Sequence, residues 1–252
     1  MKFIAYAALA ALLSAPVAFP QNDNNDSQVQ AAVQKALSGS QFKGIQASVQ
    51  NGVVTLSGST DLAANKIKAD QKAHHVKGVT AIRDEIQVNG PEIPDQKLQQ
   101  DLLKKIEYDM VGYGTTAFDA ISVQVQNGVV TLSGHAYGPV DASDAVAIAE
   151  NTKGVKDVID NIQVNPVSPN DDRIRLQVFR KVYGFPSLNK YAINPVKPIR
   201  IQVANGHVTL YGVVDNNSDK QAAGIQANSV PGVFSVTNDL QVAGQENENP
   251  GK

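Results

Sequence analysis

The densest group of charged and aromatic side chains lies between residues 171 and 200. It holds seven basic residues against two acidic ones, a local charge of +5 in a chain whose formal net charge is −2. Phe179, Tyr183 and Phe185 are interleaved with these charges. Basic groups beside apolar side chains on a helix suit an anionic membrane surface, where each contributes about 1 kcal/mol. The plainer alternative is a solvated face whose charges serve no partner.

Two further groups were considered for chemistry. His74 and His75 are adjacent in a predicted helix, about 100° apart, which is a poor geometry for sharing one metal ion. Asp84, Asp160 and Asn238 recur at an inward position of a predicted strand. The asparagine in one copy and the lack of a partnered base favour a backbone hydrogen-bonding role over acid–base catalysis.

Nucleotide and nucleophile motifs are missing from the sequence: it has no G-x-G-x-x-G after a strand, no P-loop and no G-x-S-x-G. It also has no cysteine. We therefore predict no enzyme, no cofactor, no metal site and no small-molecule substrate. Because the chain is predicted to be exported and contains no strongly basic domain, we also predict no nucleic-acid partner.

A repeated octapeptide organises the chain. NGVVTLSG at residues 51–58 returns unchanged at 127–134 and altered, as NGHVTLYG, at 205–212. Each Asn-Gly pair lies between runs of alternating apolar and polar residues, a pattern that predicts a hairpin with a two-residue type I′ turn. The sequence therefore predicts three copies of one unit.

Each unit is predicted to be α+β. A Gly-Val pair follows the turn glycine by 26 residues in every copy and precedes a third strand, and the stretch between can hold one helix with a small-residue face. In the first unit, Ser27 is a candidate N-cap for an earlier helix with Val29, Val33 and Leu37 on one face, and residues 21–26 read as a disordered tail. We expect a helix, strand, strand, helix, strand order, with two helices on one face of a three-stranded sheet. The predicted domains are residues 27–88, 95–164 and 171–242.

Residues 1–20 are typical of a secretory signal peptide. Lys2 precedes an apolar run that is too short to span a bilayer, and small residues and prolines follow it. An uncleaved anchor is the alternative. Without a cysteine the chain cannot carry a bacterial lipid anchor, so we expect an exported protein that is not a lipoprotein.

The combination of NG-VTLSG hairpin, alanine-rich helix and closing GV-x-x-V-x-N/D-x-I/L-x-V strand resembles the BON domain of bacterial envelope proteins. That family includes osmotically inducible periplasmic proteins and a phospholipid-binding outer-membrane lipoprotein. The resemblance implies an αββαβ fold, residence in the periplasm, no catalysis, and binding to membranes or unfolded clients. Those relatives carry two such domains where this chain has three.

The repeats differ most in the connection that leads to each hairpin. From the last apolar residue of the first helix to the turn glycine there are 15 residues in the first unit, 22 in the second and 24 in the third. The added residues contain aromatic side chains, which would form either a partner surface or a lid over the domain's own core. The resulting candidates for lipid or partner binding are Arg173, Phe179, Arg180, Lys181, Tyr183, Phe185, Tyr108, Tyr113 and Phe118.

These observations predict a non-catalytic periplasmic protein that binds anionic phospholipid surfaces in envelope maintenance or osmotic stress. Two alternatives stay open. One is a chaperone (holdase) for outer-membrane or exported clients, and the other is a structural adaptor that binds another envelope protein.

Overall fold

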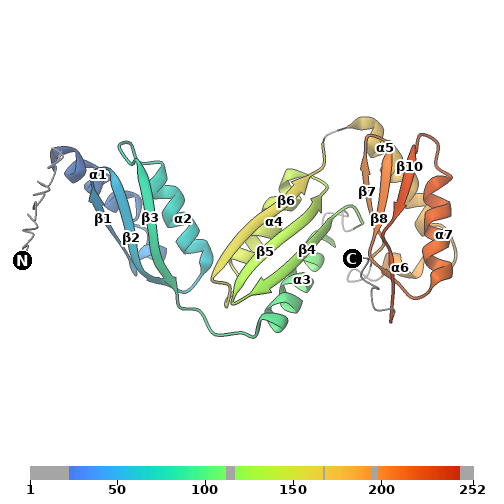
Figure 1. Cartoon of the computed structure of the whole chain (residues 1–252), viewed down its shortest axis with the longest axis horizontal. Helices are drawn as coiled ribbons and strands as arrows, with labels where there is room; N and C mark the ends of the chain where they lie inside the picture. The colour runs from blue at the N-terminus through green and yellow to red at the C-terminus, as the bar shows by residue number, and fades with distance from the viewer. Residues whose placement is uncertain (1–22, 112–116, 167, 194–197, 245–252) are drawn as a thin grey trace, which may run out of the picture.

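The computed structural model describes residues 23–111, 117–166, 168–193 and 198–244, which form three α+β domains in a row (Figure 1). The predicted signal peptide and Tyr113 lie outside these ranges. Within the described ranges, none of the helices combines the length and apolar character needed to cross a bilayer.

Each domain contributes one three-stranded sheet and the helices that cover it. The first consists of α1 (Asp23–Ala36), the short 3₁₀ helix η1 (Ser40–Phe42), β1 (Ile45–Gln50), β2 (Val53–Thr60), α2 (Ala63–His74) and β3 (Ala81–Val88). The second consists of α3 (Asp95–Val111), β4 (Ala120–Gln126), β5 (Val129–Ala136), α4 (Pro139–Glu150) and β6 (Asp157–Val164). The third consists of α5 (Pro169–Tyr183), α6 (Lys190–Ile193), β7 (Arg200–Ala204), β8 (His207–Tyr211), β9 (Val213–Val214), α7 (Asn217–Asn228), β10 (Ser235–Asn238) and β11 (Gln241–Val242).

The hairpins form where the Asn-Gly pairs predict them. In the first two domains the first strand pairs antiparallel with the second, and the third strand joins the second in parallel. The third domain follows the same order in β7, β8 and β10. Asn51 has φ = 52° and Gly52 has φ = 75°, and the other two Asn-Gly pairs also have positive φ at both residues. Both turn residues of a type I′ turn need positive φ, which Asn and Gly adopt at little cost.

The glycine that ends the octapeptide is fixed by a close approach of two strands. A Cβ on Gly58 would lie 2.1 Å from the carbonyl oxygen of Gly44, and one on Gly134 would lie 2.1 Å from that of Ala120. A distance this short between a carbon and a backbone oxygen is a clash, so only glycine fits at this point of the second strand. This explains why the repeat ends in glycine each time.

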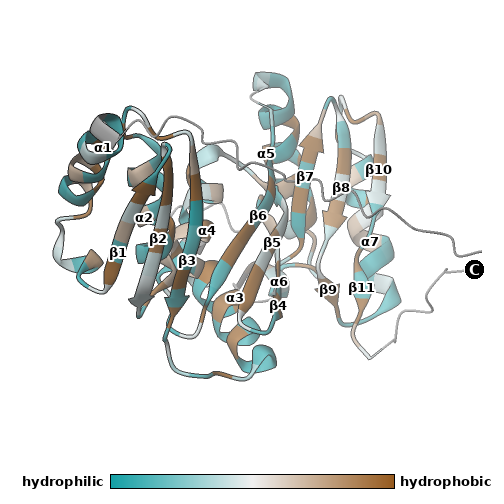
Figure 2. Ribbon diagram, turned by 60° about the vertical axis from the view of Figure 1, so that its left-hand side comes forward, coloured by the Kyte–Doolittle hydropathy of each residue, from teal (hydrophilic) through white to brown (hydrophobic). Residues whose placement is uncertain are grey.

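Both helices of a domain pack on the same face of its sheet, as predicted. Ala69 and Ala73 of α2 are fully buried, as are Ala145 and Ala149 of α4 and Ala223 and Ala227 of α7. The strands show alternating hydrophobic and polar bands (Figure 2), because successive side chains point to opposite faces of a strand. The small helix faces therefore allow close contact with the apolar side of each sheet.

The first helix begins earlier than the sequence indicated. The predicted N-cap at Ser27 was wrong, and so was the disordered tail for residues 23–26, because α1 starts at Asp23 and Ser27 lies inside it. Residues 21 and 22 lie outside the described residues. Asp26, within the presumed tail, accepts hydrogen bonds from the turn amides of Asn51 and Gly52 at 2.6 and 2.9 Å. This contact to the hairpin ties the start of the helix to the domain.

Neighbouring domains share parts of their cores. Ala63 and Ile67 of α2 pack against the core of the second domain, and Nζ of Lys66 lies 3.1 Å from Oδ2 of Asp157. The amide of Ile201 in the third domain donates to the carbonyl of Ala117 at 2.6 Å. Side-chain contacts, as well as the proline-containing linkers, therefore connect the three domains.

Candidate functional site

Helix α5 carries most of the candidate residues, and its start is well defined by local sequence. Ser168 is the N-cap, and its Oγ accepts the amide of Asp171 at 3.2 Å. Pro169 occupies the first helical position, where its missing N–H costs nothing. One side of α5 is buried, and the other is open to solvent.

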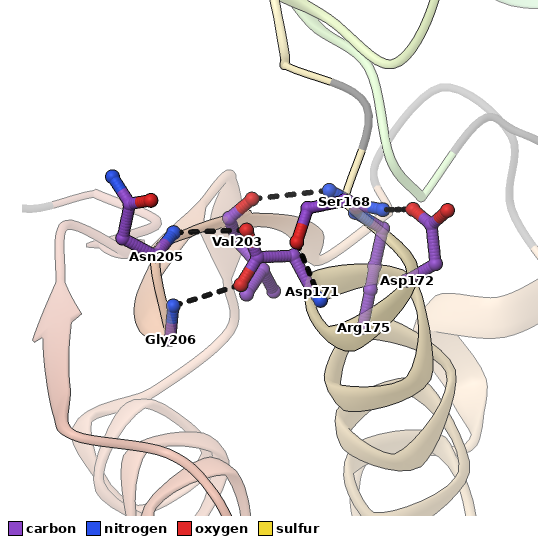
Figure 3. Close-up of polar contacts among 7 residues, drawn as sticks. All are labelled: Ser168, Asp171, Asp172, Arg175, Val203, Asn205 and Gly206. Carbon is purple, nitrogen blue, oxygen red and sulfur yellow. Dashed lines mark hydrogen bonds and ion pairs between the residues drawn. The ribbon is translucent and has the colours of Figure 1, made fainter.

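Asp171 clamps the hairpin of its own domain (Figure 3). Its two carboxylate oxygens accept the amides of Asn205 and Gly206 at 2.9 and 2.8 Å, and the side chain is almost fully buried. Asp95 makes the same pair of bonds to the turn of the second domain, at 2.7 and 2.9 Å. Together with Asp26, all three domains therefore contain a carboxylate clamp on the Asn-Gly turn.

We did not predict a role for these three aspartates from the sequence, although their spacing along the helix could have indicated one. Each stands three residues before the first buried apolar residue of its helix, as Asp171 does before Ile174. The number of residues between each aspartate and its Asn-Gly turn varies, because the connection between helix and hairpin differs in length. An alignment that starts from the turn therefore does not bring the three aspartates together.

The pKa of Asp171 reflects two opposing effects. Burial by itself raises it, but the amides of Gly206 and Asn205, the Ser168 hydroxyl and the nearby Arg175 outweigh burial. The net result is a pKa below the usual value of an aspartate. The ionised carboxylate is thus the form that the folded domain prefers.

Arg175 was counted among the seven basic residues that could face a membrane, but the structure shows that it has a structural role. It is almost fully buried, pairs through Nη1 with Asp172, and donates from Nη2 to the carbonyl of Val203 at 3.0 Å (Figure 3). Its guanidinium also lies 4.8 Å from the ring centroid of Tyr137 in the second domain. Its charge is therefore satisfied inside the molecule.

Four aromatic rings meet between the second and third domains, and we call them the interdomain aromatic cluster: Phe118, Tyr137, Phe179 and Tyr183. Centroid distances are 5.6 Å from Phe118 to Tyr137, 5.8 Å from Phe118 to Phe179 and 4.8 Å from Phe179 to Tyr183. Tyr183 donates its hydroxyl to the carbonyl of Ile199 at 2.6 Å, and burial raises its pKa above the usual value. The structure brings three predicted candidates together here, but it buries Phe118 and Tyr183 instead of presenting them to a partner.

Another part of the long connection also folds inward. Leu188 and Tyr191 are buried in the core of the third domain, and the Tyr191 hydroxyl donates to Oδ2 of Asp219 at 2.8 Å. Phe185, at the end of α5, stays exposed. The lid interpretation therefore holds for Tyr183 and Tyr191 and fails for Phe185.

The open side of α5 carries the basic residues that remain available. Arg175, Lys190 and Arg200 form ion pairs with carboxylates, and Lys197 lies outside the described residues. The exposed residues of α5 that remain, together with the half-buried Gln177, share an arc of about 140° at 100° per residue. We call this surface the basic face of α5: Arg173, Leu176, Gln177, Arg180 and Lys181.

The basic face of α5 adjoins a shallow hollow. Gln177, Arg180 and Lys181 line it together with Val230 and Pro231 from the loop after α7, and its volume is about 430 Å³. Leu176, on the same face, is 48% exposed. The surface thus combines positive charge with accessible apolar groups.

Tyr108 is not among the residues that line this hollow. It is 62% exposed near the end of α3 in the second domain. Tyr113, the other candidate of that connection, is outside the described residues. The nine candidates therefore do not form a single site.

The recurrent aspartates of the third strand and His75 make hydrogen bonds to the backbone. Oδ1 of Asp84 accepts the amide of Ile86 at 2.9 Å, and Asp160 does the same for Ile162, which confirms the backbone role predicted for this position. His75 contacts the carbonyl of Gln71 through Nδ1 at 2.6 Å. Among the residues that the structure describes, no three His, Cys, Asp or Glu side chains are placed to hold a metal ion.

Comparison with known families agrees with this architecture. The family model of the BON domain matches residues 25–90, 94–166 and 187–244, which is most of the chain. The chain belongs to the BON family. Its third BON match begins after α5, yet the Asp171 clamp places α5 in the position that α1 and α3 occupy in their own BON domains.

Two curated proteins are similar to this BON protein over about half of its length. Osmotically-inducible protein Y of Escherichia coli (strain K12) is 28% identical over 144 residues, which cover 54% of this chain and 69% of the relative. An uncharacterized protein in the gshII 5′ region of Anaplasma centrale is 27% identical over 125 residues, covering 49% and 83%. Family membership and the first of these matches support an envelope-associated, non-catalytic protein.

One comparison with solved structures covers more of the chain but fits loosely. The C-terminal domain of CdsD, a structural protein of the type III secretion system of Chlamydia trachomatis, covers 84% of this chain and 96% of its own length at 14% identity. Its TM-score is 0.24.

Proposed function

We propose that this BON protein works in the periplasm as a membrane-docking protein, and that the basic face of α5 binds anionic phospholipid surfaces. The observation that carries the proposal is the grouping of Arg173, Arg180 and Lys181 on the solvent side of one helix. Neither Arg180 nor Lys181 has an ion-pair partner among the described residues. Their charge is thus available for lipid phosphates.

The expected strength of this contact is modest. Three basic side chains near an anionic surface contribute about 3 kcal/mol together, and partial burial of Leu176 adds to that. Such binding is reversible and depends on ionic strength, because the Debye length falls from about 10 Å at 0.1 M salt to about 3 Å at 1 M. This behaviour suits a protein that moves between the periplasm and the membrane during osmotic stress.

The two alternatives have less support. A chaperone would need several exposed aromatic side chains close together, whereas Phe118 and Tyr183 are buried. An adaptor for another envelope protein would use the same open surfaces, and no particular contact favours it. Membrane docking is therefore the function we put forward.

Reversing two charges on the basic face tests the proposal. Arg180→Glu combined with Lys181→Glu removes two attractions to an anionic surface and adds two repulsions, so binding should weaken by at least about 2 kcal/mol, or at least about 30-fold. The measurement is sedimentation of the chain with vesicles of phosphatidylglycerol and phosphatidylcholine at several salt concentrations. Wild-type binding should weaken steadily as salt rises.

A matched control makes the same charge change elsewhere. Lys72→Glu with Lys77→Glu alters two exposed lysines in and after α2 of the first domain, where the other basic run has no aromatic residues. This variant should sediment like the wild type. Equal losses in both double variants, or wild-type binding that ignores salt, would rule out α5 as the docking surface.

A further inference from the structure

The loop between α7 and β10 carries the most exposed of the large hydrophobic side chains in the described part of the chain. Phe234 is 77% exposed. One edge of its ring lies over the turn residue Gly206, where an added Cβ would be 2.5 Å from Cδ2 of Phe234, and the ring centroid is 6.0 Å from that of His207. Water contact with this much aromatic surface is unfavourable. An exposed phenylalanine therefore needs a reason.

The fold does not require an aromatic residue here. The Phe234 amide donates to the carbonyl of the turn residue Gly206 at 2.9 Å. Thr80 and Lys156 make the same bond to Gly52 and Gly128 in the other two domains, at 2.8 and 2.9 Å. Since threonine and lysine serve equally well for this bond, the Phe234 side chain is a feature of the third domain alone.

The loop lies directly beside the basic face of α5. Val230 and Pro231 share the hollow with Arg180 and Lys181. Farther along the loop, a Cβ on Gly232 would lie 3.2 Å from Nη2 of Arg173. The exposed ring therefore belongs to a loop that lies beside the three basic residues used for docking.

The chemistry of this surface fits an anionic bilayer better than other occupants. A row of cations beside an exposed ring matches a headgroup layer, where phosphates lie above acyl chains. The two acidic side chains of α5 do not cancel those cations, because Asp171 is occupied by the hairpin amides and Asp172 by Arg175. The like charges of Arg173, Arg180 and Lys181 also disfavour pairing of this face with the same face of a second copy.

We propose that Phe234, supported by Pro231, enters the boundary between the headgroups and acyl chains, while Arg173, Arg180 and Lys181 bind the phosphates. This inference rests on the proposed function and adds an apolar anchor to it. Stable attachment of a peripheral protein to a membrane commonly needs such a second contribution beside charge.

The absence of tryptophan from the sequence gives a direct test. Phe234→Trp creates a chain with one tryptophan, whose fluorescence should shift to shorter wavelength on phosphatidylglycerol vesicles and be quenched by brominated acyl chains. Ile225→Trp is the matched control, because Ile225 is 65% exposed on α7 of the same domain but outside the loop. Its emission should not change when the protein sediments with vesicles.

A second variant measures the contribution to binding. Phe234→Ser should weaken vesicle binding about tenfold while the salt dependence and the unfolding midpoint stay as in the wild type. If the tryptophan of Phe234→Trp were not quenched on sedimented protein, or if Phe234→Ser bound vesicles as tightly as the wild type, the proposal that Phe234 is an apolar anchor would be overturned. Docking driven by charge would not be affected by either result. A wild-type chain that never sediments with vesicles overturns both, and loss of self-association in Phe234→Ser would assign the ring to a second copy instead.

Discussion

Replacing Asp171 with alanine is expected to destabilise the third domain by about 3 kcal/mol. The substitution removes two hydrogen bonds from an ionised carboxylate to the amides of Asn205 and Gly206. Such charge-assisted bonds contribute about 1.5–3 kcal/mol each, and the Gly206 amide would be left buried without an acceptor. The measurement is hydrogen exchange of the β7 and β8 amides, which reports on this domain separately from the other two.

Two comparisons make the Asp171 result specific. Asp239→Ala changes an exposed aspartate of the same domain and should alter stability by less than about 0.5 kcal/mol. Asp26→Ala removes the same clamp from the first domain, where the carboxylate is less buried, so its cost should be smaller. If Asp171→Ala behaved like Asp239→Ala, the clamp would contribute little to stability.

The depressed pKa of Asp171 gives the same experiment a pH dependence. Because the folded pKa lies below the unfolded value of about 3.9, the stabilisation is complete above that value and is lost as pH falls through the folded pKa. The third domain should thus lose stability below about pH 4, and Asp171→Asn should remove this part of the acid dependence. If the third domain of Asp171→Asn lost stability at low pH as the wild type does, protonation of Asp171 would not be the cause of that loss.

Replacing Phe118 with alanine is expected to cost about 3 kcal/mol, mostly by separating the second domain from the third. Phe118 belongs to the second domain, but it packs into the core of the third, against Phe179. Truncating a buried phenylalanine typically costs 3–5 kcal/mol, and the lower end applies because this site lies at a domain boundary. By calorimetry, wild-type domains two and three should unfold together, while the variant should show two transitions.

The control for Phe118 is Tyr108→Ala, which removes an exposed ring from the same domain. It should leave the number of transitions unchanged and shift stability by less than about 0.5 kcal/mol. The contact of Arg200 with Glu107 at 2.6 Å would remain in Phe118→Ala. A single unaltered transition in Phe118→Ala would therefore assign the coupling to these polar contacts and not to the aromatic cluster.

The parts of the fold that depend on residues close together in the sequence could be predicted from it. The Asn51-Gly52 turn, the alternation along β1 and β2 and the small face of α2 are all local patterns, and the structure contains each of them. The BON resemblance then supplied the order of strands and helices, which the family match supports.

The features that depend on contacts between domains could not be predicted from the sequence. Arg175 reads as one more surface charge until the Tyr137 ring and Asp172 are seen around it. The width of the apolar side of α5 indicated that something must cover it, and the sequence left open whether that was a neighbour or a partner. Phe118 covers Phe179, whereas Leu176 stays open. Burial of this kind is decided by residues that lie far apart in the chain.

The most direct test of the account measures whether α5 faces the membrane. The chain has no cysteine, so Leu176→Cys places a single thiol on the basic face, and Gln71→Cys places one on an exposed position of α2 as a reference. We predict that phosphatidylglycerol vesicles slow maleimide labelling of the α5 thiol and leave the α2 thiol unaffected, while phosphatidylcholine vesicles change neither. Labelling of the α5 thiol at an undiminished rate on sedimented protein would contradict it.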